Sequence, residues 1–135
     1  MKTFIKATVV VLFLAFAISA CSKDHTELES MYTLTPTEIL GEYKNNEVAA
    51  DDKYKGKVIT ISGKVQSIRS GFLGGPKVSL VDEGSGFLGL NSVDCEFKEE
   101  DSKTLLSLKV GDVVSIKGLV KGQILGSIMM DGCSL

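Results

Sequence analysis

The sequence has few of the residues on which most enzymes and nucleic-acid binders depend. It contains no tryptophan, one histidine and one arginine. The histidine, His25, lies in a polar stretch near the N-terminus, which argues against His-based acid–base or nucleophilic chemistry and leaves no centre with two or three histidine ligands. Lys2 and Lys6 lie in residues 1–20, which are predicted below to be a signal peptide. The rest of the chain has 13 basic and 17 acidic residues, a formal charge of −4. Nucleic-acid binding, which needs several Lys or Arg to neutralise phosphates, is therefore not expected.

Motifs for cofactor or nucleophile chemistry are also missing. No glycine-rich loop has the spacing that cradles phosphates. Gly84-Ser85-Gly86 is not a Gly-x-Ser-x-Gly elbow and is better explained as a hairpin turn. The acidic runs Asp82-Glu83 and Glu99-Glu100-Asp101 do not match a calcium loop, and adjacent acids on a strand point to opposite faces. We predict no cofactor, no metal and no enzymatic activity.

Residues 1–20 have the layout of a bacterial lipoprotein signal peptide. Two lysines precede twelve apolar or small residues, Ala7 to Ile18. As a helix with a rise of about 1.5 Å per residue, this run would cover roughly 18 Å, well short of the roughly 30 Å hydrocarbon core. The sequence Ile18-Ser19-Ala20-Cys21 resembles a lipobox, which implies that Cys21 carries a diacylglycerol. The alternative is an ordinary secreted protein in which Cys21 occurs by chance.

This layout predicts where the protein works. Two or more acyl chains hold a protein stably on a membrane. We therefore expect a lipid-anchored protein of the cell envelope, on the periplasmic face or the outer surface of a Gram-negative membrane. Residues 21–34 are predicted to be the acylated cysteine and a polar tether, and residues 35–135 a single domain.

Cys95 and Cys133 are the cysteines that remain besides Cys21. An oxidising envelope compartment permits them to form a disulfide. Such a bond would close a separation of 38 residues, for which the chain-entropy model gives about 3 to 4 kcal/mol. Alternatively, they are two buried thiols that pack as small apolar groups.

The segment that follows the tether predicts one amphipathic helix. Thr35 can cap it, Pro36 suits its first position, and Glu38 completes a capping box. Apolar residues then recur at spacings of three or four as far as Tyr54, and Gly56 ends the pattern. An isolated helix of this length is marginal in water, so its apolar side should pack against the domain.

From Lys57 onward the pattern alternates every two residues, which predicts strands. Two long segments share it, and each contains a glycine, Gly63 or Gly118, that would allow sharp coiling of the strand or close approach of another backbone. A turn at Lys121-Gly122 is predicted to lead into the last strand. In order, the expected elements are strands at 58–65, 77–81 and 87–97, a short helical connector at 98–109, and strands at 113–120 and 124–135.

Three strands, a helical connector and two more strands are the order of an OB-fold, a mainly β, five-stranded Greek-key barrel. Here the N-terminal helix precedes the barrel. The chain resembles the tRNA_anti-like OB-fold family of bacterial envelope proteins and lipoproteins over roughly residues 38–135. The residues that carry the resemblance are Asn46 to Ala50, Tyr54 to Lys57, Ile61 to Val65, Val93 to Phe97, Gly111 to Gly118, and Cys133. These motifs imply the fold, and a fold does not by itself define a function.

OB-folds bind ligands on the face of their second and third strands, which is bordered by the loop between strands one and two and the loop between strands four and five. We predict that the candidate ligand face here comprises Phe72, Leu73, Phe87, Arg69 and Lys77. Phe72 and Leu73 lie in a glycine-rich loop and form either a contact site or a lid on the barrel.

Three hypotheses about function remain open at this point. The first is a non-enzymatic binding or scaffold module that holds a protein partner or an oligosaccharide. The second is a nucleic-acid-binding OB domain, which the fold favours and the charge and location oppose. The third is a hydrolase or metal-dependent enzyme that uses only carboxylates.

Overall fold

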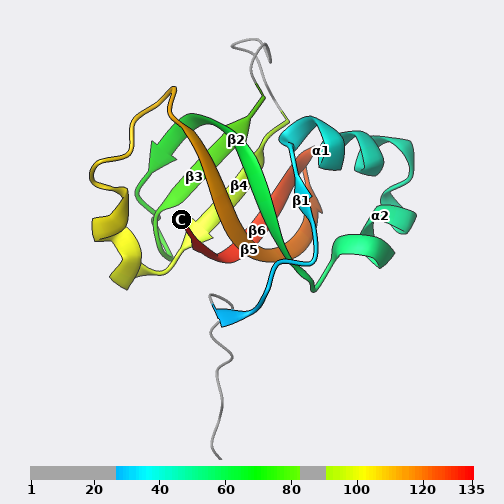
Figure 1. Ribbon diagram of the computed structural model, residues 1–135, viewed down its shortest axis with the longest axis horizontal. Coiled ribbons are helices and arrows are strands. Elements are labelled where there is room, and N and C mark those ends of the chain that lie inside the picture. Colours follow the sequence, from blue (N-terminus) through cyan, green and yellow to red (C-terminus); the bar gives the residue numbers. More distant parts are fainter. Residues whose placement is uncertain (1–26, 83–90) are drawn as a thin grey trace, which may run out of the picture.

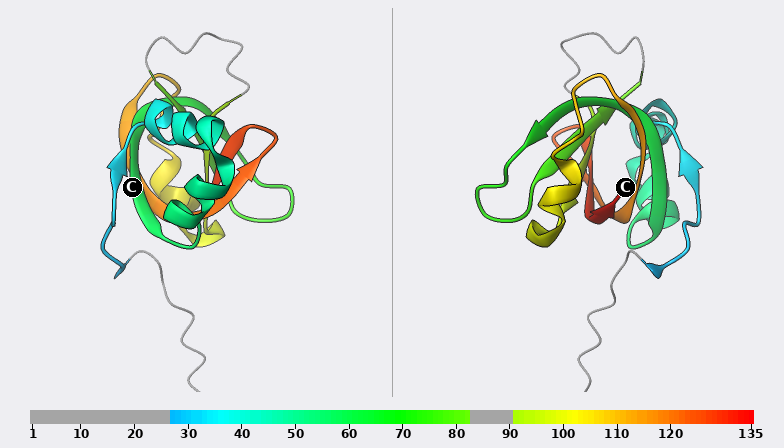
Figure 2. Two further views of the ribbon diagram at one scale, coloured as in Figure 1. Left: turned by 90° about the vertical axis from the view of Figure 1, so that its right-hand side faces the viewer. Right: turned by 60° about the vertical axis from the view of Figure 1, so that its left-hand side comes forward.

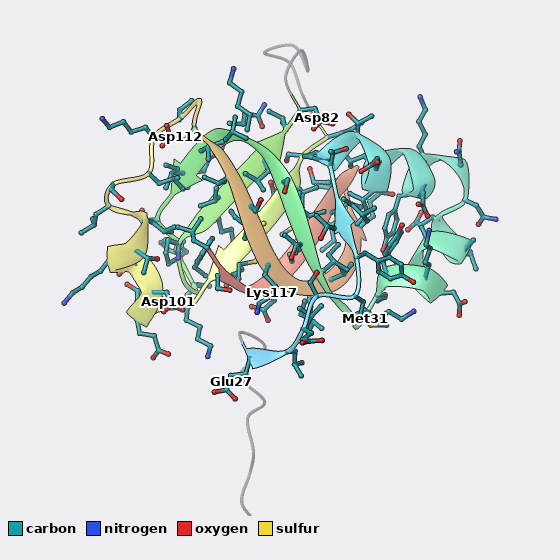
Figure 3. The ribbon with its side chains drawn as sticks, viewed as in Figure 1. Glu27, Met31, Asp82, Asp101, Asp112 and Lys117 are labelled. Carbon is teal, nitrogen blue, oxygen red and sulfur yellow. The ribbon has the colours of Figure 1, made fainter. Side chains whose placement is uncertain are left out.

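The computed structural model describes residues 27–82 and 91–135. The first strand of this described part is short. This strand, β1 (Thr33–Leu34), runs parallel to the start of β2 (Val58–Arg69). Met31 N–H donates to the Val58 carbonyl at 2.9 Å, just before the strand begins. Figure 3 shows Met31 next to the barrel, at the point where the N-terminal segment reaches it, and Glu27 farther from the barrel on the same segment. The segment predicted as a tether, residues 21–34, therefore ends in an ordered strand.

The predicted N-terminal helix is two helices, α1 (Pro36–Asn45) and α2 (Glu47–Tyr54). The predicted capping box is present, because Thr35 accepts from Glu38 N–H while the Glu38 carboxylate accepts from Thr35 N–H. Asn46 divides the helix because its backbone is extended, at φ −159°, and its side chain caps α2 by accepting from Ala49 N–H. Asparagine is a preferred N-cap residue, and a periodic apolar pattern conceals such a break.

Five strands close into a barrel in the order expected of an OB-fold, and β1 adds a sixth strand outside it. The barrel strands are β2, β3 (Lys77–Val81), β4 (Val93–Phe97), β5 (Val113–Ile124) and β6 (Ser127–Ser134). The first half of β2 pairs with β5 and its second half with β3. The predicted fold class, a mainly β OB-fold barrel with a helical connector between its third and fourth strands, is confirmed.

The two ends of the barrel are covered by different elements (Figures 1 and 2). Helices α1 and α2 cover one end through their buried residues Ile39, Tyr43, Ala50 and Tyr54. The connector η2 (Glu99–Leu105), a 3₁₀ helix, lies at the other end and buries Leu105. Both ends of the barrel are covered by packed side chains, and its interior is filled by the buried apolar side chains of the hydrophobic core. Among residues 27–82 and 91–135, no helix is long and apolar enough to span a membrane.

The turns between the strands match those predicted from the sequence only in part. The predicted hairpin at Asp82 to Gly86 and the residue Phe87 lie mostly or wholly outside the described residues. The turn predicted at Lys121-Gly122 is wrong, since β5 continues to Ile124. Gly122 instead occupies an irregularity in the β5–β6 pairing, with φ +116°. A glycine within a strand marks a bulge as readily as a turn, and here it marks the bulge.

The close approach predicted at the two strand glycines is confirmed. A Cβ at Gly63 would lie 2.9 Å from Pro36 Cγ, at the start of α1. A Cβ at Gly118 would lie 2.6 Å from Cys133 Sγ and 3.2 Å from the Asp131 carbonyl oxygen. The distances of 2.9 Å and 2.6 Å are shorter than a carbon atom tolerates, so glycine at these positions lets α1 pack directly on β2 and lets β6 pack directly against β5.

We expect Gly118→Ala to lower the free energy of unfolding by about 1–3 kcal/mol, because the added methyl group overpacks the contact with Cys133. Gly41→Ala is the matched control. Gly41 is inside α1 with no atom within 4 Å of a built Cβ, so alanine there should raise stability by about 0.5–1 kcal/mol. Urea denaturation measures both changes. Equal stability of the Gly118→Ala variant and the wild type would contradict this packing.

Cys95 and Cys133 lie on the neighbouring parallel strands β4 and β6, and both are completely buried. They are free thiols in this structure. A hydrogen bond that the Cys133 thiol donates to the Cys95 sulfur, together with burial, raises the pKa of the Cys133 thiol. The two sulfur atoms are therefore neighbours within the core.

The disulfide between Cys95 and Cys133 stays a prediction, and alkylation of denatured protein tests it. We expect protein isolated from the envelope without reductant to leave both thiols unlabelled, with an intact mass two hydrogens below that of the reduced chain. Labelling of both thiols would show that they pack as reduced side chains. Cys95→Ser serves as the control, since it must leave Cys133 available to the reagent.

Candidate binding face

A polar surface covers the outside of β3 and β4, in alternation with the core side chains. Val78, Leu80, Val93, Cys95 and Phe97 point inward and are buried. The intervening residues are solvent-accessible. We call the accessible set the polar face, and its members are Arg69, Lys77, Ser79, Asp94 and Glu96.

Strand register arranges the polar face in two rows. Arg69 of β2 is opposite Lys77 of β3, and Lys77 is opposite Glu96 of β4. In the second row Ser79 is opposite Asp94. The structure thus brings the predicted residues Arg69 and Lys77 together on adjacent strands.

Two of the four charged side chains of the polar face form an ion pair with each other. Lys77 Nζ lies 3.2 Å from Glu96 Oε2. Asp94 Oδ1 accepts a hydrogen bond of 2.7 Å from the Ser92 hydroxyl. Arg69 is exposed, and no carboxylate within residues 27–82 and 91–135 pairs with it. Within residues 27–82 and 91–135, the cation Arg69 and the anion Asp94 of this face take part in no ion pair. The face therefore offers no cationic groove of the kind that follows a phosphate backbone.

The loop at residues 70–76 borders one end of the polar face. Pro76 accepts a hydrogen bond of 2.9 Å through its carbonyl oxygen from Phe97 N–H, at the end of β4. Gly75 is buried so close to Phe97 that a Cβ would overlap the Phe97 carbonyl oxygen. Only glycine permits this approach. The base of the 70–76 loop is thus fixed to β4.

The tip of the 70–76 loop carries the two predicted apolar residues into solvent. Phe72 is 97% exposed and Leu73 is 91% exposed. A lid would bury these side chains over the barrel, so the lid hypothesis is wrong for both residues. Two adjacent, fully exposed large apolar side chains on an anchored loop fit a contact site, because binding residues are often carried by loops on a rigid scaffold.

The groups with perturbed pKa values lie away from this face, between the two helices. The Tyr54 hydroxyl donates to Glu42 Oε1 at 2.7 Å, and Lys53 Nζ donates to the same carboxylate at 3.0 Å. These two bonds lower the pKa of Glu42. Burial, and then a hydrogen bond to Asp51, raise the pKa of Tyr43. These bonds join α1 to α2, so we interpret them as structural.

No group of three or more potential metal ligands occurs in the described part of the chain. Phe87, the remaining predicted member of the ligand face, lies outside the described residues. The sequence reasoning also missed an apolar residue, Leu125, which is 97% exposed in the turn between β5 and β6. Its Leu-Gly sequence lacks the Asn-Gly or Asp-Gly signal of a two-residue hairpin.

The closed five-stranded barrel, the sixth strand outside it and the covering helices together define an OB-fold domain. The family model tRNA_anti-like matches residues 1–134. The chain belongs to the tRNA_anti-like family. Among curated proteins, no relative matches it.

Solved structures with a similar fold include a proposed nucleic acid-binding lipoprotein from Klebsiella pneumoniae. It is 21% identical, with a TM-score of 0.62 over 76% of this chain and 88% of the other. A second is the OBody AM1L10 bound to hen egg-white lysozyme, which is 22% identical, with a TM-score of 0.44 over 58% of this chain and 75% of the other. At such identities the likeness shows the fold alone.

We expect Phe72→Ala and Leu73→Ala together to leave the free energy of unfolding within about 0.5 kcal/mol of the wild type, as for most surface substitutions. Phe97→Ala, at a position only 2% exposed, is the contrasting control and should cost about 3–5 kcal/mol. Thermal unfolding of the three proteins compares them. An early transition in the Phe72→Ala, Leu73→Ala variant would show that the loop tip packs against the core.

Proposed function

We propose that this chain is a lipid-anchored, non-enzymatic binding module of the cell envelope, and that its ligand is a protein. The observation that carries the proposal is the pair Phe72 and Leu73, exposed on a loop whose base is fixed to β4. Large apolar side chains that are exposed together favour contact with another protein, since their burial then supplies the binding free energy.

The composition of the polar face supports a protein rather than an oligosaccharide. Sugar rings are commonly bound by stacking on aromatic side chains. Of the five aromatic residues described by the structure, Tyr43, Tyr54 and Phe97 are buried, and Tyr32 packs against Tyr54. Phe72 alone is fully exposed, at the loop tip and not within the face.

Nucleic-acid binding is the second candidate, and the description of the Klebsiella lipoprotein favours it. Single-stranded nucleic acid binds OB-folds through stacking aromatics and a cationic groove. Here Lys77 is paired with Glu96, and Arg69 is the remaining cation of the polar face. Net acidity reduces the electrostatic attraction further. The charges of the polar face and of the whole chain therefore support a protein ligand over a nucleic acid.

The anchor belongs to the proposal as well. The lipobox ends at Cys21, and the Klebsiella pneumoniae protein of similar fold is also called a lipoprotein. Met31 is the first residue bonded to the barrel strands in the described part of the chain. At about 3.5 Å per residue, residues 22–30 reach roughly 30 Å at most. The partner would therefore lie on or close to the membrane.

We expect Cys21→Ser to release the protein from the membrane, because the residue that accepts the lipid is lost. Fractionation with a salt wash measures the distribution, and the wild-type chain should remain in the membrane pellet. Equal recovery of the variant and the wild type in that pellet would contradict lipid anchoring at Cys21.

Photo-crosslinking in cells tests the ligand class. We expect the full chain with a benzophenone amino acid in place of Phe72 to form a light-dependent adduct of discrete mass that resists nucleases and glycan-cleaving enzymes. Val48, which is 81% exposed on α2, is the control position and should not form this adduct. Nuclease-sensitive adducts at position 72 would support the second candidate instead. Absence of any protein adduct there would refute the proposed function.

A further inference from the structure

The turn between β5 and β6 holds a leucine in a conformation that leucine rarely adopts. Ile124 pairs with Ser127, which leaves Leu125 and Gly126 as a two-residue turn. Leu125 has φ +50° and Gly126 has φ +88°. Positive φ at both positions is typical of a type I′ turn, where asparagine, aspartate or glycine is favoured first. A leucine there carries backbone strain that a glycine would not.

Packing does not account for the leucine. Its side chain is 97% exposed, and that of the preceding Ile124 is 60% exposed. The side chain thus contributes almost nothing to the core, while its backbone conformation is unfavourable. A residue that is both strained and fully exposed is better explained by contact with another molecule.

Leu125 lies across the polar face from the predicted apolar pair. Strands β4 and β6 run parallel, both starting beside the β5–β6 turn, and β4 ends at the 70–76 loop. In the left view of Figure 2 this loop and the β5–β6 hairpin extend from the same side of the barrel. At about 3.3 Å per residue, the five residues of β4 separate the base of the β5–β6 turn from the base of the 70–76 loop by roughly 15 Å.

The charges between the two tips indicate the chemistry of a partner. Lys77 and Glu96 form an ion pair, and Asp94 accepts a hydrogen bond from the Ser92 hydroxyl. Arg69, on the strand that leads to Phe72, has no carboxylate partner among the described residues. Arginine beside an exposed aromatic residue is a composition enriched at the centres of protein interfaces. A carboxylate on the partner would compensate this charge with a bidentate hydrogen bond.

We infer that Leu125 is the second contact of a two-point protein-binding site. The partner presents one apolar side chain to Leu125, another to Phe72 and Leu73, and a carboxylate to Arg69 on the strand that leads to Phe72. This inference rests on the proposed function and adds to it the second contact and the chemistry of the partner surface.

Leu125→Gly separates this role from a structural one. Glycine removes the side chain and accepts positive φ without strain. The purified full-length variant should therefore melt at the wild-type temperature or a few degrees above it. In cells, the same substitution should lower the yield of the protein adduct at position 72 by about tenfold, as expected when the burial of one leucine is lost. Val48→Ala, at another exposed apolar position, should leave the yield unchanged.

A photo-reactive residue at position 125 gives the second readout. It should form an adduct with the same partner as position 72, as judged by mass and by peptide sequencing. For the carboxylate, Arg69→Glu should lower the adduct yield at position 72 at least tenfold, whereas Arg69→Lys should retain most of it, because a positive charge remains.

The outcomes distinguish the inference from the proposed function. A protein adduct at position 72 whose yield is unaffected by Leu125→Gly would overturn the second contact and leave the proposed function standing. A melting temperature lowered by Leu125→Gly would also overturn it, because the leucine would then be structural. An adduct yield at position 72 that Arg69→Glu leaves unchanged would refute the proposed carboxylate on the partner. Failure of position 72 to yield any protein adduct would refute the proposed function and this inference together.

Discussion

The coiling of β2 is the constraint on which the rest of this structure depends. Lys64 is the residue at which β2 passes from one partner to the other, since it pairs with Val113 of β5 and with Val81 of β3. A register irregularity between Val65 and Ser67 follows immediately. Irregularities of this kind increase local twist and allow a strand to turn a barrel corner. Without that turn, β3 and β5 could not be joined by one strand and the barrel would not close.

The candidate binding face follows from this closure. The second half of β2 carries Arg69 onto the same surface as Lys77 and Glu96, and the 70–76 loop begins where β2 ends. Because Gly75 packs on Phe97, the direction of the loop is set by β4 and not by the loop's own residues. The apolar tip is thus held at one end of the face before any partner binds, which reduces the ordering cost of binding.

The sequence predicts the elements whose signals are local and unopposed. The capping box at Thr35, the alternation of β2 and β5, and the need for glycine at Gly63 and Gly118 are confirmed in the structure. Three features were not predictable in this way. Asn46 interrupts a continuous apolar period, and Gly122 gives a turn signal where the strand only bulges. β1 has only two residues, which are too few to show the alternating pattern of a strand. At Asn46 a local cap ends one helix and begins the next, whereas at Gly122 and in β1 the pairing with other strands decides the conformation.

For the binding face, the sequence predicted the neighbouring positions of Arg69, Lys77 and the apolar loop, but not which of them has a charged partner. The central claim is that this face recognises a protein and not a polyanion. Fluorescence anisotropy of labelled single-stranded RNA, titrated with the full-length protein at physiological salt, tests it most directly. The account predicts no binding up to tens of micromolar protein, since few cations are available for counterion release. Micromolar affinity that weakens steeply as salt rises would contradict it.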